Sequence, residues 1–551
     1  MHDMNDDPTS DSNSAPVSAY APLQRPVFRA LWIASVASNL GTWLQNVGAA
    51  WLMTSLSPSP MMVAFVQAAT TLPVFILAIP AGALADVVDR KRLLLIAQAW
   101  MLLAATILSA ATFFNVMTPW LLLALTFALG VGFALNAPAW QAIIPELVPR
   151  SEVPAAVALN GVSMNASRAV GPAIGGLLVA AAGPAAAFLL NAISFVGVFA
   201  VLFSWRRSTK DSALPSERLV GALRVGIRYV RNAPQFQAIL VRAAAFVTGA
   251  SGLWALLPLL ARTHADWGPL GYGVMLGAVG AGAVIGTILL PSVRNRVNAD
   301  LIALGGSLVY AAGAALLTIA PGVWTSCLVL LPCGAAWLAV LTEFSSSAQS
   351  LLPAWVRARA LSVYLLVFFG GMSAGSMIWG GLANIIGAQQ SLAASAAWMV
   401  LGAATYAFYR LPSGPPPEVE PSHHWPEAPI VPNAAHDHGP VLVTVEYHIL
   451  QKSAALFRSA VLQLRSARLR DGAIRWDLFQ DAENHERFVE AFLVESWAEH
   501  LRQHERVTHD DRALERAARA FHVGDQPPKV THLVAATGPF DNHHAESRPC
   551  P

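Results

Sequence analysis

Hydrophobic residues dominate the chain from Pro26 to Arg410, where long apolar stretches alternate with short polar or basic loops. About twelve such stretches occur, and each is long enough to cross a bilayer as a helix. The expected spans are 28–53, 59–84, 93–113, 119–140, 155–182, 184–205, 236–260, 269–291, 300–320, 323–346, 356–386 and 389–409. The pattern therefore predicts an all-α polytopic membrane protein with twelve transmembrane helices.

The apolar region contains an internal duplication. The segment Gln141–Pro145 (QAIIP) recurs as Gln349–Pro353 (QSLLP), 208 residues later, and an arginine-bearing loop and a glycine-rich helix follow each copy. We therefore expect two six-helix halves, 26–205 and 236–410, joined by a basic cytoplasmic loop at 206–235. Two similar bundles with a path between them are the arrangement of a secondary transporter.

A different pattern begins after a linker at 411–439, which is rich in proline and histidine. The expected elements of the following domain, 440–535, are a strand at 441–449, a helix at 453–470, strands at 474–480 and 487–495, a polar helix at 497–521 that is unbroken or broken near Thr508, and a strand at 529–535. This βαββαβ order predicts a small cytosolic α+β domain with a ferredoxin-like fold. The ends, 1–25 and 536–551, are expected to be disordered tails.

Charge separates the same two regions. The 551 residues are 55% hydrophobic with a mean hydropathy of +0.49, yet charged side chains are sparse in the apolar region and dense after position 440. The net charge of +2 is uninformative about nucleic acid, and no long basic run supports binding it. The three cysteines do not suggest a disulfide framework, and no metal site or cofactor is predicted.

When the loops are counted from the N-terminus, almost all loop lysines and arginines fall in one alternating set. The other set carries only Arg262. Because positively charged loops remain cytoplasmic, both termini are predicted to lie inside, with the protein in the cell (inner) membrane. The first 24 residues are polar and acidic, without the basic and apolar segments of a secretory signal.

The loop between the second and third spans carries a candidate conformational latch made of Gly82, Asp86, Arg90, Lys91 and Arg92. Glycine permits close backbone approach at a helix end, and Asp86 can cap a helix and pair with arginine in one cytoplasmic conformation. The basic triplet can hold the loop at anionic membrane lipids. An ordinary positive-inside loop would explain the triplet but not Gly82 and Asp86 at their spacing.

Charged residues inside a membrane are costly, so each is a functional candidate. Arg168 lies about 13 residues into the fifth span, roughly 20 Å from its cytoplasmic end. It is predicted to be a cation in the substrate path that meets an anionic or catecholate-like group. The alternative is a structural arginine held by Asn160, Asn165 or carbonyl groups.

Glu343, in the span 323–346, is the candidate for proton coupling, because a desolvated carboxylate can take up a proton. Its position near the cytoplasmic end also suits a gate or a partner for Arg357. Uncharged polar residues are expected to line the substrate path, namely Asn39, Gln45, Asn46 and Asn136. Six tryptophans are expected to divide between interface anchors and cavity walls: Trp32, Trp43, Trp51, Trp140, Trp254 and Trp337.

The fifth span contains Gly171, Pro172, Gly175 and Gly176. Proline can bend the helix, and the small residues let a neighbouring helix approach closely. The glycines of the span 269–291 make a similar surface, so we expect these two helices to pack against each other across the halves. Plain helix packing accounts for the glycines about as well as a specific transport motif does.

These motifs resemble those of the major facilitator superfamily over roughly residues 26–410. Gly82, Asp86 and the basic triplet match its loop signature, although Asp89 replaces a glycine found in many members. The segments Asn39–Gln45 and Asn136–Gln141 resemble the branch of enterobactin-type siderophore exporters, often described as transmembrane secretion effectors. Gly171, Pro172, Gly175 and Gly176 resemble a signature associated with antiporters. The resemblance implies alternating access and export driven by protons, although the first and fourth spans lack the acid that many proton-coupled relatives carry.

Residues 441–535 resemble the antibiotic-biosynthesis-monooxygenase-like fold, a dimeric α+β barrel, through the segments Arg470–Trp476, Phe492–Trp497 and His500–His504. The resemblance implies dimerisation through this domain. His500 and His504 share a helical face with Trp497 and could bind a metal or haem. A partly exposed helix that packs its tryptophan on the sheet explains the same residues more simply.

The sequence therefore favours a transporter, not an enzyme, that exports a small amphiphilic molecule and has protons and membrane lipids as partners. One alternative is a transporter–enzyme fusion whose C-terminal domain oxidises or senses the cargo. Another is an importer or lipid flippase of the same fold, because fold alone fixes neither direction nor cargo.

Overall fold

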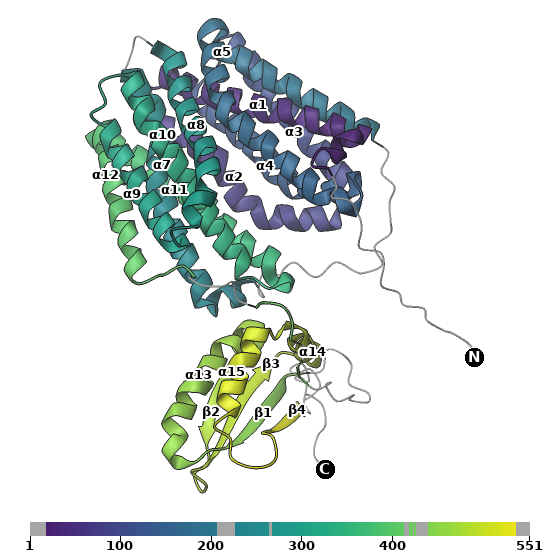
Figure 1. Ribbon diagram of the computed structural model, residues 1–551. Helices are drawn as coiled ribbons and strands as arrows, with labels where there is room; N and C mark the ends of the chain where they lie inside the picture. Colours follow the sequence, from purple (N-terminus) through teal and green to yellow (C-terminus); the bar gives the residue numbers. More distant parts are fainter. Residues whose placement is uncertain are drawn as a thin grey trace, which may run out of the picture. The chain divides into compact units, whose positions relative to one another are not determined.

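The computed structural model describes residues 18–205, 226–263, 267–412, 418–422, 424–425 and 439–535. Long helices dominate the first three of these ranges, and a small sheet with its own helices lies in the last (Figure 1). The chain divides into two compact units. The first holds the described residues of 1–216, 242–342 and 365–406, and the second holds those of 217–241, 343–364 and 407–551.

The apolar region folds into long helices, as its hydrophobic pattern predicts. Their bounds are α1 (Pro26–Leu56), α2 (Pro60–Val87), α3 (Arg90–Phe113), α4 (Pro119–Leu147), α5 (Val153–Ser204), α7 (Pro234–Thr263), α8 (Gly268–Arg294), α9 (Ala299–Leu317), α10 (Val323–Ser350), α11 (Ala354–Ile386) and α12 (Ala388–Ala403). Nine helices within the described residues are long and apolar enough to cross a membrane. The fold is that of a mostly helical, polytopic membrane protein, and the total of twelve spans stays a prediction.

The sequence duplication reappears in the helix starts. The helices α1 and α7 begin at Pro26 and Pro234, and the helices α2 and α8 begin at Pro60 and Gly268. Both pairs are separated by 208 residues, the spacing of the repeated QAIIP and QSLLP segments. Proline suits a helix start because the N–H that it lacks has no partner within the helix there. The two halves therefore begin these helices in the same register.

Two glycines with a positive φ, one in each half, end a helix within the described residues. α5 is broken at Gly183, whose φ of 79° is not helical and which Pro184 follows. The expected boundary between the spans 155–182 and 184–205 falls at this residue. In the second half, Gly387, with a φ of 91°, separates α11 from α12. A positive φ is unfavourable for residues with a Cβ, so glycine at both positions allows the chain to turn.

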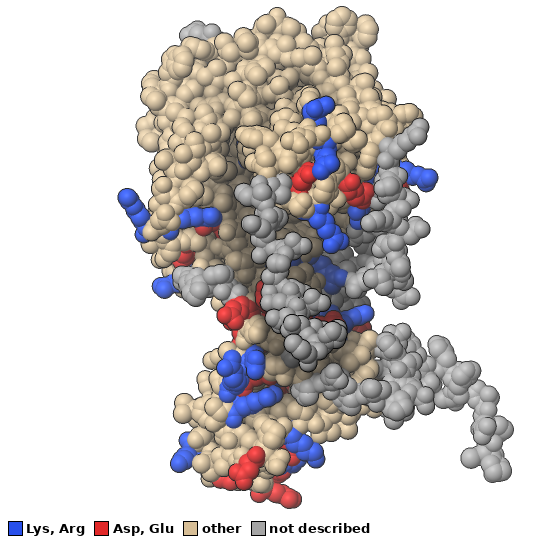
Figure 2. Space-filling model, turned by 45° about the vertical axis from the view of Figure 1, so that its right-hand side comes forward, with Lys and Arg blue, Asp and Glu red and all other residues tan. Residues whose placement is uncertain are grey.

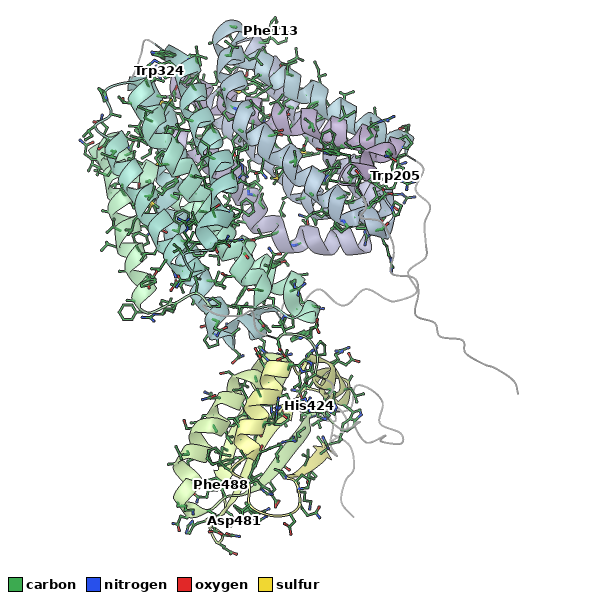
Figure 3. All side chains as sticks on the ribbon, viewed as in Figure 1. Phe113, Trp205, Trp324, His424, Asp481 and Phe488 are labelled. Atoms are coloured by element: carbon green, nitrogen blue, oxygen red, sulfur yellow. The ribbon has the colours of Figure 1, made fainter. Side chains whose placement is uncertain are left out.

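The surface of the helices is mainly apolar. Uncharged residues cover most of the helical face in view, whereas charged side chains are frequent on the small domain (Figure 2). Exposed apolar side chains such as Ile288 and Leu328 fit a surface that faces lipid. Phe113, at the end of α3, and Trp324, at the start of α10, lie at the same end of the bundle (Figure 3).

The C-terminal domain contains one antiparallel sheet. Its strands are β1 (Val441–His448), β2 (Ala473–Gln480), β3 (Arg487–Val494) and β4 (Lys529–Val534), in the order β2-β3-β1-β4. The helices α13 (Ala454–Asp471) and α15 (His509–Arg519) cover one face, and α14 (Trp497–Arg506) follows β3 (Figure 1). Alternate residues of β1 are buried, as the period of a half-buried strand requires.

The predicted helix 497–521 is two helices, which confirms the alternative of a break near Thr508. The Thr508 hydroxyl accepts a bond from the backbone N–H of Asp511, and the Asp511 carboxylate accepts one from the backbone N–H of Thr508. This capping box satisfies the first backbone groups of α15 and explains why a new helix begins here.

Part of the predicted linker packs against the C-terminal domain. Pro421 forms an isolated β-bridge with Thr508, and the backbone N–H of Ser422 donates to Val507 at 2.9 Å. His424 and Trp425 also pack here, and Figure 3 shows His424 at the opposite end of the sheet from Phe488 and Asp481. These residues therefore belong to the domain and do not form a free tether.

Candidate functional site

A cavity of about 230 Å³ lies among helices of both halves within the first unit. The lining residues come from seven helices, so no single segment of the chain defines it. From the first half they are Trp43, Asn46, Ala50, Val63, Val66, Gln67, Thr70, Thr71 and Arg168; from the second half they are Trp254, Ala255, Pro258, Tyr272, Leu276, Trp337, Phe368, Phe369 and Met372. A cavity shared by two repeated bundles is where a substrate path is expected.

Arg168 contributes the positive charge of this cavity. It lies on α5 and also borders a smaller adjoining void with Pro172 and Gly280. Within the described part of the chain, no carboxylate or other acceptor pairs with its guanidinium. Asn165 donates to the carbonyl of Gly161 at 3.0 Å, and Asn160 lines a separate small cavity. The sequence alternative, an arginine held by these two asparagines, therefore finds no support in the described contacts.

Aromatic rings form much of the cavity wall. The ring of Trp337 lies 5.6 Å from that of Trp254 and 6.2 Å from that of Phe368, measured between centroids. Trp43 completes this group on α1. The structure thus places three of the six flagged tryptophans in the wall. The sequence does not single out Phe368 and Phe369, because nothing in an apolar span distinguishes a wall residue from a core residue.

Close helix packing fixes α5 at the cavity. A Cβ at Gly171 would meet the Cβ of Trp43 at 2.6 Å, so α1 and α5 are in contact through this glycine. On another side, a Cβ at Gly176 would lie 2.7 Å from the Cα of Gly273, and one at Gly280 would lie 2.7 Å from the carbonyl oxygen of Arg168. The expected packing between the glycine-rich fifth and eighth helices is confirmed. It holds the backbone of Arg168 in place.

Both Gly175 and Pro172 lie within the same packed region of α5. A Cβ at Gly175 would lie 3.2 Å from the Cα of Leu44, so this glycine also faces α1. Pro172 lies inside the helix, is buried, and borders the void next to Arg168. The four residues of the predicted motif therefore position the helix that carries Arg168.

The predicted polar path residues separate into two groups. Asn46 lines the cavity together with Arg168. Asn39 instead donates to the Ser163 hydroxyl at 3.2 Å, and Asn136 accepts from Gln98 at 3.1 Å. Both bonds join different helices.

Gln45 belongs to the second group. It is buried and accepts a hydrogen bond from Asn191, which joins α1 to the part of α5 that follows Gly183. The structure therefore brings Asn46 and Arg168 together at the cavity and places Asn39, Gln45 and Asn136 in contacts between helices.

The glycine of the predicted latch does not make the expected close contact. Apart from the neighbouring backbone of its own helix, no described heavy atom lies within 4 Å of the place that a Cβ would take at Gly82. Gly82 lies inside α2, which continues as far as Val87, on a side of the helix that faces open space. Asp86 lies in the same helix, but its side chain is outside the described residues, and its pairing stays a prediction.

The basic triplet of the latch joins α3 to its neighbours. Arg90 forms an ion pair with Glu146 at the end of α4, at 2.9 Å. Lys91 donates to backbone carbonyl groups at the end of α5. Asp89 accepts from the backbone N–H of Arg92 at 2.9 Å and so caps α3. This cap explains why an aspartate can stand where relatives of the resembled superfamily have glycine.

Two further charges were missed by the sequence analysis. Arg242 on α7 and Asp300 on α9 form a buried ion pair, and Tyr406 lies against the guanidinium at 5.7 Å. The signal was present, because Arg242 stands inside the expected span 236–260. Glu343 on α10 is also buried, at 2% exposure, and is not among the residues that line the cavity.

The histidines of the C-terminal domain form a compact cluster. His500 is buried, its Nε2 lies 3.3 Å from that of His504, and its ring lies 4.8 Å from that of His532. Burial lowers the pKa of all three, with that of His500 falling to about 4, so they are neutral imidazoles. Among the described residues, no group of three or more ligand side chains could hold a metal ion.

Comparisons with known proteins identify the kind of protein. The sequence profile of a family described as transmembrane secretion effector matches residues 17–539. The staphyloferrin A transporter of Staphylococcus aureus (strain NCTC 8325 / PS 47) is 26% identical over 47% of this chain and 65% of its own length, so the chain spans just under two thirds of that relative. The enterobactin exporter EntS of Salmonella choleraesuis (strain SC-B67) is 26% identical over 58% of this chain and 76% of its own length. The solved structure of the nucleoside transporter NupG matches with a TM-score of 0.56 at 12% identity, covering 70% of this chain and 99% of that one, and shows a shared fold.

Proposed function

The chain belongs to the transmembrane secretion effector family of major facilitator transporters, and from that premise we propose that it exports a small anionic amphiphile through the cavity at Arg168. The observation that carries the proposal is a guanidinium at a cavity shared by both halves, with no described counter-charge. Such a cation gains most from a carboxylate or catecholate, through charge-assisted hydrogen bonds. The ring wall of Trp43, Trp254 and Trp337 suits the apolar body of the same molecule.

The cargo class is a siderophore, drug or secondary metabolite with at least one negative charge. The relatives named for staphyloferrin A and enterobactin support a siderophore. The cavity volume of about 230 Å³ is below the roughly 300–1,000 Å³ of typical ligand pockets. We therefore expect the path to widen when the halves move during alternating access. The named relatives are transporters, so the membrane-spanning body is a transporter and not an enzyme.

Export requires a driving force and an orientation. We assign proton coupling to Glu343, because it is a buried carboxyl group in a transmembrane helix. The segment from Gly82 to Arg92 acts as the latch of one conformation, and the ion pair of Arg90 with Glu146 supports this role. The protein lies in the cell (inner) membrane, and its basic loops and both termini face the cytoplasm.

We infer a ferredoxin-like fold of the antibiotic-biosynthesis-monooxygenase-like type for the C-terminal domain. The strand order β2-β3-β1-β4 and the antiparallel pairing of all neighbours support this inference. A second copy of the chain is its expected partner, as in the dimeric barrels that it resembles.

The test is accumulation of catecholate and carboxylate siderophores in an efflux-deficient bacterium that expresses the full chain. Wild type should lower accumulation, and Arg168→Gln should remove the effect at equal expression. Arg296→Gln, which removes an exposed arginine outside the cavity, is the matched control and should behave as wild type. Export by Arg168→Gln at the wild-type rate would refute the role of the cation, and accumulation raised by wild type would indicate import.

A further inference from the structure

The second unit joins the C-terminal domain to three segments of the transporter. Residues 226–231 are helical and precede α7, residues 343–350 end α10, and residues 351–364 include the start of α11. Within this unit, the hydroxyl of Tyr229 donates to the carbonyl of Leu351 at 3.2 Å, and its ring meets that of Trp355 edge to face. Burial raises the pKa of Tyr229 to about 12, so the hydroxyl keeps its proton and remains a donor.

The domain contacts these segments through a buried carboxylate. Glu499, in the first turn of α14, accepts from Arg506 of the same helix at 2.6 Å and from Arg228 before α7 at 2.8 Å. Arg506 also donates to the carbonyl of Asp471 and lies 4.4 Å from the centre of the Trp355 ring. Arg228, Trp355, Glu499 and Arg506 are the Glu499 cluster.

The charges of the cluster are complementary and largely removed from water. The side chain of Glu499 is 9% exposed, and that of Arg228 is 17% exposed. Burial acts to raise the pKa of Glu499, but the hydrogen bonds and charges of Arg506 and Arg228 outweigh it and hold the pKa below its usual value. Through the pair of Glu499 and Arg228, the cluster therefore joins two ionised groups that come from distant parts of the chain.

The first half shows what the cluster replaces. There, Arg25 pairs with Glu152 at 2.7 Å and Arg90 pairs with Glu146 at 2.9 Å, so two acids near the connection of α4 and α5 hold the ends of the helices together. The residues 208 positions later are uncharged. The second half has Ala354 and Ala360 at the positions of the acids, and Ala233 and Asn298 at those of the arginines.

We propose that the C-terminal domain contributes Glu499 to the second unit, as the acid that the repeat has lost. Through the Glu499 cluster it ties the segment before α7 to the start of α11 at the predicted cytoplasmic end. A half that moves as one body needs its helix ends held together, and the first half achieves this with its own loop. Loss of the tie lowers the rate of the conformational change and leaves cargo affinity unchanged, because the cavity residues are elsewhere. The effect on rate rests on the proposed function; the tie itself does not.

Arg228→Gln is the decisive variant. It removes the transporter's charge from the cluster, while Glu499 keeps its bonds to Arg506, so the domain retains its internal pairing. Arg231→Gln is the matched control, because this arginine is exposed and lies three residues away on the same segment. Trp355→Ala and Trp355→Phe form a second pair. Phe keeps an aromatic face for Arg506, and the indole N–H has no partner among the described residues, so no hydrogen bond is lost.

Hydrogen exchange on the purified full chain measures the tie without any cargo. Arg228→Gln and Trp355→Ala should speed exchange at least tenfold in residues 226–235 and 351–360, whereas Arg231→Gln and Trp355→Phe should match wild type. In proteoliposomes the first two variants should lower the maximal rate about tenfold with an unchanged KM, and Arg228→Lys should restore most of it. Unchanged exchange would refute the claim that the Glu499 cluster holds these two segments together. Faster exchange with a normal maximal rate would overturn its role in transport. Because exchange needs no cargo, a wrong substrate assignment would not alter that result.

Discussion

Two arginines, one in the membrane cavity and one inside the C-terminal domain, have opposite surroundings. Arg468 is bonded to Glu490 at 3.1 Å and to Glu515 at 2.7 Å, and the ring of Trp425 lies 5.0 Å from its guanidinium. Arg168 lines a cavity and has no counter-charge in the described part of the chain. The first is a structural charge whose bonding capacity is already used by the protein. The second has capacity left for a ligand, so pairing, more than burial, separates a binding cation from a structural one.

The largest expected effect is on the stability of the C-terminal domain. Arg468→Met would leave Glu490 and Glu515 buried beside an apolar side chain. Breaking a buried ion pair by removing one partner costs about 3–5 kcal/mol, so the domain should unfold at much lower denaturant concentration. Hydrogen exchange in the full chain measures this locally. Arg168→Met is the control for the comparison and should leave the exchange of the whole chain unchanged. Equal stability of wild type and Arg468→Met would show that pairing does not define the structural arginine.

Acid should weaken the same domain. Burial lowers the pKa of His500 to about 4 from 6.5, with help from the charges of His504 on α14, His532 on β4 and Arg468 on α13. Between these two pH values His500 is therefore protonated in the unfolded chain and neutral in the folded domain. Above about pH 6.5 His500 is neutral in both states and does not alter stability. As the pH falls toward 4, protonation of the unfolded chain lowers the free energy of unfolding by up to about 3 kcal/mol.

His500→Gln should flatten this dependence of domain stability between pH 7 and 4. The control is His485→Gln, which removes an exposed histidine in the turn between β2 and β3. The measurement is hydrogen exchange in the domain at several pH values, corrected for the intrinsic pH dependence of exchange. A wild-type domain that is equally stable at pH 7 and pH 4.5 would contradict the neutral interior that the comparison assumes.

The cavity should respond to charge in the cargo. Arg168→Gln should raise the KM for an anionic siderophore about tenfold to hundredfold, because a hydrogen bond to a charged group contributes about 1.5–3 kcal/mol. The KM for the methyl ester of the same molecule should change little, and Arg168→Lys should keep most of the selectivity for the anion. Transport into inverted membrane vesicles gives both constants. Equal losses for acid and ester would mean that Arg168 holds the cavity in shape and does not bind the charge.

The helices could be predicted from the sequence with their ends placed to within about seven residues, because each apolar span must satisfy its backbone internally. The break at Gly183 also fell at the expected boundary, since Gly183 and Pro184 stand between two spans. The cavity could only be predicted in part. Arg168 was identifiable because a charge in a span needs a reason, whereas Phe368 is one apolar residue among many. For Gly82 the sequence predicts a close approach of another backbone, but the space beside it is open, which the sequence alone does not show.

The comparison extends to uncharged residues and gives the smallest predicted effect. Asn46 lines the cavity, and no described residue bonds to its side chain, whereas Asn136 accepts a hydrogen bond from Gln98 on the neighbouring helix. Hydrogen bonds between membrane helices contribute on average only about 0.6 kcal/mol, so Asn136→Ala should lower stability slightly and leave the KM unchanged.

Asn46→Ala should do the reverse, with an unchanged stability and a KM that rises a few-fold, about the effect of one neutral hydrogen bond to cargo. Thermal unfolding in detergent and transport kinetics would be measured for both variants side by side. If the two asparagines gave the same pattern, an unpaired polar group at the cavity would be no better a guide to cargo binding than a paired one. The assignment of Arg168 as the binding cation would then rest on its charge alone, because its lack of a partner would carry no information.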